Sequence, residues 1–193
     1  MTQWQTKPVT DPVIQWVGKT LGCDLQTGPW IAGGTPRLLW NDESWWGHDI
    51  DVFVSSMTGL ERLQTKMKQI SWPAHQTRNA YTYNLEHAEK THKVQIICKD
   101  FHRSLAQLFS YFDFTVCKFA TDGNLIVADQ QTVADCERRE LVWNTTSPQG
   151  LSTYRVIKYS AYGFDIDNQM LDKLVKRYQE NPLQFNVDAD YEG

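Results

Sequence analysis

This sequence lacks the features that would place a protein in a membrane or mark it for export. No run of residues approaches the ~20 apolar positions that a helix needs to cross a bilayer. The first residues, MTQWQTKPVTD, contain neither the basic region nor the apolar stretch of a secretory signal. The four cysteines are widely spaced, with no paired zinc-knuckle spacing, and are interpreted as free thiols in a reducing compartment. We therefore expect a cytoplasmic protein without a membrane partner.

The sequence also has no excess of positive charge. It contains 19 Lys and Arg residues against 23 Asp and Glu residues, which gives a formal net charge of −4. This balance excludes a large nonspecific nucleic-acid surface but leaves room for a small acceptor groove. With 193 residues, of which 41% are hydrophobic, the chain is long enough for one compact domain and a small helical appendage.

Two aspartates with one residue between them stand in the segment His48–Val54, which reads HDIDVFV. The alternation of polar and apolar residues predicts a half-buried strand. Successive side chains of a strand point to opposite faces, so Asp49 and Asp51 share one face and the apolar residues the other. Two carboxylates this close repel each other unless a cation lies between them, and Mg²⁺ prefers such oxygen ligands. The pair therefore predicts a metal site suited to phosphoryl chemistry.

A glycine pair precedes this strand. Gly33 and Gly34 follow a short apolar strand at 30–32 and lead into a helix for which Thr35 is the expected N-cap and Pro36 the first helical residue. A turn without side chains at a helix start exposes backbone donors to an anion. The glycine turn followed by the aspartate strand indicates a phosphate site beside a metal site.

A third carboxylate, Asp113, lies between two phenylalanines in the apolar segment 111–117, which is predicted to be a strand. An apolar strand accommodates a charge only if the charge is paired or used. Asp113 is therefore expected to join the aspartate pair. The Asp122-Gly123 turn predicts a hairpin into a strand at 125–128.

The rest of the chain alternates helices and strands, and no internal repeat or low-complexity linker is visible. Asp11 and Pro12 are expected to begin a helix that ends near Leu21. Two more strands are predicted at 78–86 and 93–98. Further helices are predicted at 58–70, 101–109, 130–142, after Pro148 and at 167–179.

These motifs together resemble the polymerase beta-like nucleotidyltransferase superfamily, in particular the catalytic head of bacterial-type CCA-adding enzymes and poly(A) polymerases. Those enzymes carry Gly-Gly-x-x-Arg before the aspartate pair, matched here by Gly33, Gly34 and Arg37. The aspartate that usually follows that arginine is Leu38. The resemblance covers roughly residues 28–165 and implies a truncated, minimal form of the family.

The second signature of the CCA-adding group, Arg-Arg-Asp-Phe-Thr followed by an apolar residue and an asparagine, is matched at Asp113–Thr115 only. The resemblance gives Asp113 two alternative roles, one at the metal or as a base and the other at the ribose. In the later segment LSTYRVIKYSAYGF, Arg155 and Lys158 fall where the family has its basic helix. The Glu-Asp pair that recognises the base in the family is replaced by Leu151 and Ser152.

The resemblance implies an α+β nucleotidyltransferase fold, with a mixed, antiparallel-rich sheet, packed helices and a small C-terminal helical part. We divide the chain into a catalytic domain at 1–129, a helical appendage at 130–185 and a disordered acidic tail at 186–193.

The predicted reaction moves an NMP from an NTP such as ATP to an acceptor hydroxyl, with an RNA 3′ end as the favoured acceptor, and releases pyrophosphate. Two Mg²⁺ ions would be held by Asp49, Asp51 and Asp113. The nucleotide would be held by the remaining site residues, which are Gly33, Gly34, Thr35, Arg37, Arg155 and Lys158. Two alternatives stay open: a toxin-like enzyme that modifies a protein or small molecule, and an inactive nucleotide-binding module.

Overall fold

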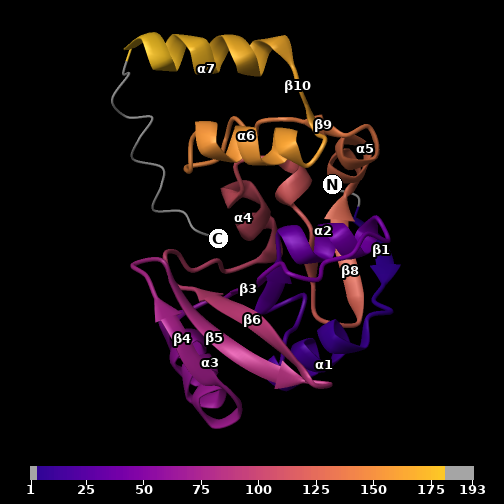
Figure 1. The fold of residues 1–193 in the computed structure, drawn as a ribbon, viewed down its shortest axis with the longest axis vertical. Helices are drawn as coiled ribbons and strands as arrows, with labels where there is room; N and C mark the ends of the chain where they lie inside the picture. The colour runs from indigo at the N-terminus through magenta and orange to yellow at the C-terminus, as the bar shows by residue number, and fades with distance from the viewer. Residues whose placement is uncertain (1–3, 181–193) are drawn as a thin grey trace.

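A computed structural model describes residues 4–180 of the chain, and its main feature is an eight-stranded sheet (Figure 1). Across the sheet the order is β1-β8-β7-β2-β3-β6-β5-β4, and every neighbouring pair except β3 and β6 is antiparallel. The strands of this sheet are β1 (Trp4–Pro8), β2 (Trp30–Ala32), β3 (Ile50–Phe53), β4 (Trp72–Gln76), β5 (Ala80–His87), β6 (Lys90–Ile97), β7 (Ala120–Thr121) and β8 (Leu125–Asp129).

The helices gather toward two ends of the molecule: α1 and α3 lie at one end and α6 and α7 at the other (Figure 1). The helices are α1 (Pro12–Leu21), α2 (Gly34–Trp40), α3 (Met57–Ile70), α4 (Leu105–Tyr111), a 3₁₀ helix (Thr115–Cys117), α5 (Gln130–Glu137), α6 (Thr153–Ala161) and α7 (Asn168–Glu180). Within residues 4–180 no helix combines the length and the apolar character needed to cross a bilayer. The α+β, mainly antiparallel architecture is the one predicted.

Strand β3 lies in the middle of the sheet and carries the aspartate segment. It pairs with β2 on one side and runs parallel to β6 on the other. Ile50 and Val52 are fully buried, whereas Asp51 is only partly buried, on the opposite face. Ile50 and Val52 thus face the core as the alternation predicts, while the face of Asp51 also carries the buried Phe53.

Helix α1 begins as its sequence predicts, because the Asp11 side chain accepts hydrogen bonds from the amides of Val13 and Ile14. Its buried face packs against the turn that joins β7 to β8. A Cβ atom on Gly18 would lie 2.2 Å from the carbonyl oxygen of Asp122, so the helix can approach this turn only because position 18 is glycine.

The predicted strand at 111–117 is wrong. Tyr111 ends α4, and the chain then becomes a 3₁₀ helix at Thr115–Cys117, with one isolated bridge between Phe114 and Trp143. The apolar run is buried without forming a strand: Phe112 packs on Phe53 of β3, and Phe114 packs on Tyr159 of α6. Sequence periodicity cannot separate these two cases in a short run.

Two strands of the large sheet were not predicted, and both lie at its edges. β1 ends at Pro8, and β4 contains Pro73 and is exposed along its whole length. Proline in a strand is confined largely to such edges, where the missing donor faces no neighbour. The prolines weaken the strand signal of both segments.

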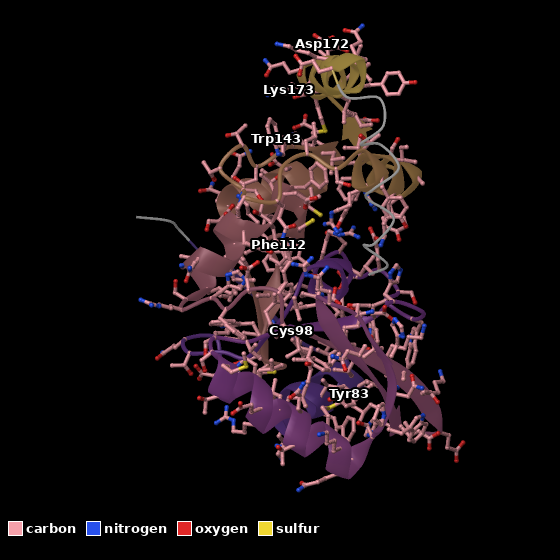
Figure 2. The ribbon with its side chains drawn as sticks, turned by 90° about the vertical axis from the view of Figure 1, so that its left-hand side faces the viewer. Tyr83, Cys98, Phe112, Trp143, Asp172 and Lys173 are labelled. Atoms are coloured by element: carbon pink, nitrogen blue, oxygen red, sulfur yellow. The ribbon has the colours of Figure 1, made fainter. Side chains whose placement is uncertain are left out.

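The C-terminal part consists of α5, α6, α7 and a small parallel sheet of β9 (Glu140–Leu141) and β10 (Asp165–Ile166). Asp167 caps α7, as its position predicts, by accepting a hydrogen bond from the amide of Met170. Figure 2 shows Lys173 of α7 above Trp143, and its Nζ lies 4.7 Å from the centre of the Trp143 ring. The predicted tail at 186–193 lies outside the described residues.

Candidate active site

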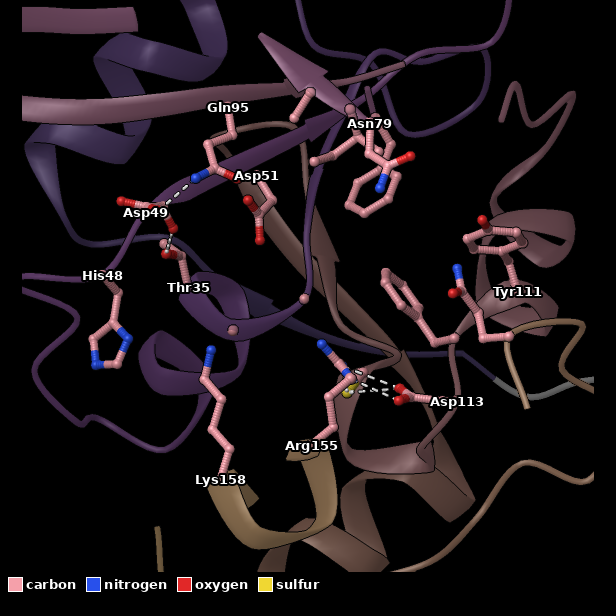
Figure 3. A pocket seen from close by; sticks show the side chains of 18 of the residues that line it. Thr35, His48, Asp49, Asp51, Asn79, Gln95, Tyr111, Asp113, Arg155 and Lys158 are labelled. Carbon is pink, nitrogen blue, oxygen red and sulfur yellow. Dashed lines mark hydrogen bonds and ion pairs between the residues drawn. The ribbon is translucent and has the colours of Figure 1, made fainter. Parts of the chain in front are cut away.

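A pocket of about 320 Å³ opens on the face of β3 that carries Asp51. Its walls come from the glycine turn before α2, from the sheet, from the segment after α4 and from α6 (Figure 3). The nine predicted site residues, far apart in the sequence, all line this pocket: Gly33, Gly34, Thr35, Arg37, Asp49, Asp51, Asp113, Arg155 and Lys158.

The aspartate pair is held by a residue that sequence analysis missed. Gln95, on β6, is the register partner of Asp51 across the parallel pair of strands. Its Nε2 donates a hydrogen bond to Asp49 Oδ2 at 2.6 Å, as Figure 3 shows. The only signal in the sequence was a polar residue at an inward position of the apolar run KVQIIC. Gln95 is 8% exposed, so its amide is a fixed part of the pocket wall.

The Asp51 carboxyl group is difficult to ionise in this pocket. Burial, and after it the neighbouring Asp49 carboxylate, raise the pKa of Asp51 to about 7. Its Oδ1 is buried and has no hydrogen-bond partner. A buried carboxylate oxygen without a partner, next to a second carboxylate, fits a divalent cation with oxygen ligands. The residues present are therefore compatible with Mg²⁺.

Positive charge enters the pocket from α6, whose first turn is capped by Ser152. This helix directs Arg155 and Lys158 toward the aspartates (Figure 3). Burial and the nearby Arg155 lower the pKa of Lys158, while Asp51 and Asp49 oppose that change. Asp49 and Asp51 thus lie across one cavity from Arg155 and Lys158.

Arg37, in α2, adds a third cation. The residue is only 3% exposed and lies over the rings of Tyr159 and Phe164, with its Cζ 5.7 and 5.2 Å from their centres. Within residues 4–180 it takes part in no ion pair, and its Nε has no hydrogen-bond partner. A buried guanidinium group without an acid beside it is suited to an anionic ligand.

The glycine turn differs in detail from its prediction. The N-cap of α2 is Gly33, with φ of 90°, and not Thr35, because the helix already begins at Gly34. The amide of Gly33 donates to the carbonyl oxygen of Phe119, so it is already engaged within the protein. Thr35 instead donates through Oγ1 to the backbone oxygen of Asp49, at 2.9 Å, and so ties the turn to the aspartate segment.

Asp113 also lies in the pocket, but its carboxylate is paired. Arg155 donates to it from two nitrogens, Nε to Oδ2 at 2.6 Å and Nη2 to Oδ1 at 3.0 Å. Within residues 4–180 no group of three His, Cys, Asp or Glu side chains could hold a metal ion. The three carboxylates form no such group among these residues, and Arg155 compensates the charge of Asp113; a role of Asp113 at the metal stays a prediction.

Three further aromatic side chains, His48, Trp45 and Trp46, lie near the aspartates in the sequence. His48 lines the pocket, and burial together with the charge of Arg37 lowers its pKa. Trp45 is 2% exposed, and its Nε1 donates to Asp11, which places it in the core. Trp46 stacks on Trp45 with ring centres 5.1 Å apart, and neither indole is among the residues that line the pocket.

Comparison with solved structures identifies the fold as that of polymerase beta-like nucleotidyltransferases. The chain is similar to a CCA-adding enzyme in complex with CTP, with a TM-score of 0.65 and 16% identity over 93% of this chain and 48% of that one. It is also similar to a Thermotoga maritima CCA-adding enzyme complexed with tRNA, with a TM-score of 0.63 and 17% identity over 93% and 47% of the two chains. A tRNA nucleotidyltransferase with a primer tRNA and an ATP analog matches at a TM-score of 0.54 and 17% identity, over 88% of this chain and 51% of that one. The chain thus spans about half the length of these proteins.

Comparison by sequence gives one family. A model described as "Gad2: Gabija anti-defense 2 family protein" matches residues 10–139, which include β2, α2, β3 and the aspartate pair. A search of curated proteins gave no match.

Proposed function

The chain belongs to the Gabija anti-defense 2 family, and from this premise and the pocket geometry we propose that it is a metal-dependent nucleotidyltransferase. It would transfer an NMP from an NTP to an acceptor hydroxyl and release pyrophosphate. The observation that carries the proposal is that acidic and basic side chains face each other across one pocket. Asp49 and Asp51 stand on one wall with an unpartnered carboxylate oxygen, and the cations of α6 stand across from them (Figure 3).

In this proposal Asp49 and Asp51 hold Mg²⁺, with up to two ions shared between them. Bound Mg²⁺ would supply Lewis-acid chemistry, which lowers the pKa of an attacking hydroxyl and neutralises charge on the leaving pyrophosphate. Gln95 fixes Asp49 through one carboxylate oxygen and so presents the other to the pocket. Thr35 holds the backbone of Asp49 in the same place.

The cations would hold the triphosphate. Arg37 offers a buried guanidinium group without an acid partner, and Lys158 brings its ammonium group to the same cavity. The backbone at Gly34 leaves open space, since an added Cβ atom would meet no atom within 4 Å, so a phosphate can approach it closely. Together these groups would offset the charge that builds up as pyrophosphate leaves.

Arg155 and Asp113 would orient the nucleoside. Because the two-point ion pair fixes the plane of the guanidinium group, its remaining nitrogen can present donors to a base or a ribose at a defined angle. Asp113 would then act by positioning Arg155, in place of the metal-binding role predicted from sequence.

For the acceptor we favour an RNA 3′ end, in the cytoplasm. The similar structures contain CTP and tRNA, which supports a nucleotide and an RNA as partners. A protein or small-molecule acceptor, as in a toxin-like enzyme, fits the net charge of −4 equally well. The name of the family links it to anti-defense action, and an inactive fold that only binds a nucleotide would fit such a role without catalysis.

The test is to incubate the purified protein with Mg²⁺, each of four α-labelled NTPs and total cellular RNA, and then to identify what becomes labelled. We expect label in RNA or a protein, and its loss in Asp49→Asn. Glu61→Gln, a change of an exposed acid on α3, is the matched control and should leave labelling intact. Nucleotide binding without labelling of any acceptor would favour the inactive module and contradict transfer.

A further inference from the structure

A second cavity, of about 360 Å³, adjoins the pocket of the aspartates. It lies between the loop that follows β6, the helix α4 and the segment at 148–149. Three residues line both cavities, namely Lys99, Tyr111 and Gln149. Molecules in the two cavities could therefore both contact these three shared side chains.

Tyr111 forms a fixed aromatic wall between the two cavities. Its hydroxyl donates to Asp100, and its ring packs against the imidazole of His102, with ring centres 4.8 Å apart. Ser147 donates through its hydroxyl to the backbone oxygen of Tyr111 at 2.6 Å. A ring held at its hydroxyl by Asp100 and against His102, on a backbone fixed by Ser147, offers a preformed surface on which a flat heterocycle can stack.

His102 lines this second cavity and carries a polar atom whose hydrogen bonding is unsatisfied. The residue lines the cavity and is only 3% exposed, yet its Nε2 has no hydrogen-bond partner. Burial lowers the pKa of His102, so the ring is neutral and Nε2 can exchange one hydrogen bond with a ligand. A buried polar atom of this kind costs free energy until a ligand satisfies it.

The polar groups of the cavity are arranged for a ligand with several donors and acceptors. Gln107 accepts a hydrogen bond from the amide of Arg103 through Oε1, at 2.7 Å, which leaves its Nε2 to donate. Asp100 supplies carboxylate oxygens. Lys99, which donates to Gln149 at 3.4 Å, places a positive charge where the two cavities meet.

We propose that this second cavity is the acceptor site, and that it takes a ribonucleotide unit with a free ribose hydroxyl. The proposal rests on the proposed nucleotidyl transfer and names its acceptor. The base would stack on Tyr111 and hydrogen-bond to His102 and Gln107, while Lys99 would contact the phosphate. The same chemistry is offered by a free mononucleotide and by the 3′-terminal nucleotide of an RNA.

In this transfer every bond and proton is accounted for. The oxygen of the ribose hydroxyl forms a bond to the α-phosphorus of the NTP in the first pocket. The bond from the α-phosphorus to the bridging oxygen breaks, and its electron pair leaves with pyrophosphate. The hydroxyl proton passes to water. The product is a nucleotide unit extended by one phosphodiester.

Binding of the acceptor can be measured apart from catalysis. In the Asp49→Asn protein, saturated with a non-hydrolysable NTP analogue, we expect a hexaribonucleotide or a nucleoside monophosphate to bind. Ser110→Trp, which fills the second cavity, should raise the acceptor Kd at least tenfold, and His102→Phe should raise it several-fold. Ser160→Trp, on the exposed side of α6, is the matched control and should leave the Kd unchanged. The affinity for the NTP analogue should be the same in all variants, which also shows that they are folded.

Competition between the two ligands shows whether the acceptor is a free nucleotide or an RNA end. Competition by the monophosphate as strong as by the hexamer identifies a free nucleotide, and preference for the hexamer identifies an RNA end; both support the site. If neither cavity variant changes the acceptor Kd, or if both change only the Kd of the analogue, the assignment is wrong. Transfer of label to protein hydroxyls in the active enzyme would equally overturn it. Loss of all labelling with acceptor binding intact would instead refute nucleotidyl transfer and leave a nucleotide-binding cavity.

Discussion

Arg155 and Asp113, 42 residues apart in the chain, meet in a two-point ion pair that forms one wall of the pocket. The amide of Phe114 donates to the same carboxylate at 3.0 Å. Asp113 is almost fully buried, and the ion pair with Arg155 compensates its charge without any ligand. The acidic residues of the pocket are therefore divided between two tasks, with one pair facing the cavity and a third residue holding a cation.

This division predicts that Asp113 and Asp49 respond differently to loss of charge. Asp113→Asn leaves Arg155 with a weakened partner, and we expect it to lower the free energy of unfolding by about 3 kcal/mol. Binding of Mn²⁺, followed by calorimetry, should change little. Asp49→Asn should show the reverse, with weakened Mn²⁺ binding and nearly unchanged stability. Equal loss of metal affinity in both variants would return Asp113 to the role of metal ligand.

Gln95 predicts a second pair of outcomes. Gln95→Leu removes the donor that holds Asp49, and we expect metal affinity or activity to fall about 10- to 100-fold. Gln95→Glu adds a third carboxylate beside Asp51, which should lower the Tm of the metal-free protein and strengthen Mn²⁺ binding. Gln69→Leu, at an exposed position on α3, serves as control. An unchanged Mn²⁺ affinity in both Gln95 variants would show that Gln95 does not support the site.

The pKa of Asp51 predicts the pH dependence of stability without metal. Its pKa of about 7 in the fold, against an ordinary value of 3.8, means that the folded protein keeps a proton that the unfolded chain has lost. The free energy of unfolding should therefore fall as pH rises from about 4 to about 7, by at most about 1.4 kcal/mol per pH unit from this group. Denaturant titrations of the metal-free protein and of Asp51→Asn measure this slope, which the variant should reduce. Mg²⁺ should restore stability at the upper end of the range, since it replaces the proton. Equal slopes for the two proteins would contradict the raised pKa.

Arg37 predicts that ligand affinity and stability can be separated. Because its guanidinium group is buried without an acid partner, Arg37→Met should weaken NTP binding about 10- to 100-fold, the value of a charge-assisted hydrogen bond. The free energy of unfolding should stay the same or rise, since an uncompensated buried charge is removed. Arg62→Met, on the exposed side of α3, is the control. A large loss of stability with unchanged NTP affinity would identify Arg37 as a structural residue.

The contact between α1 and the β7–β8 turn gives a prediction for the scaffold alone. Gly18→Ala places a methyl group 2.2 Å from the backbone oxygen of Asp122, which must shift the helix. We expect a loss of about 1–3 kcal/mol or more in thermal or denaturant unfolding. Lys19→Ala, one residue along and exposed, should change stability little. If Gly18→Ala is as stable as the natural protein, the close approach is not maintained in solution.

The sequence was most informative where a local pattern has a single structural outcome. Alternation in β3 and β6, the Asp11 cap of α1 and the Asp122-Gly123 hairpin each fix a conformation within a few residues. The fold class followed from these elements together with the family resemblance. The nine candidate residues all reach one pocket, although their functions stay a proposal.

The sequence was least informative where burial depends on distant parts of the chain. Phe112 is buried against Phe53 of β3 and Phe114 against Tyr159 of α6, which no local pattern reveals. Asp113 was assigned to the aspartate pair because its actual partner, Arg155, is supplied by a helix much later in the chain. Gln95 was missed for a related reason, since its role depends on the register of β6 against β3.

The match to the family ends at residue 139, before α6 begins, although α6 brings Arg155 and Lys158 into the pocket. The segment that matches the family thus provides Asp49 and Asp51, and helix α6, which lies after it, provides two of the positively charged side chains. Exchanging that one helix could retune which anion the protein accepts and leave the carboxylates as they are. A relative with a different residue at position 155 or 158 would then recognise a different ligand with the same pair of carboxylates.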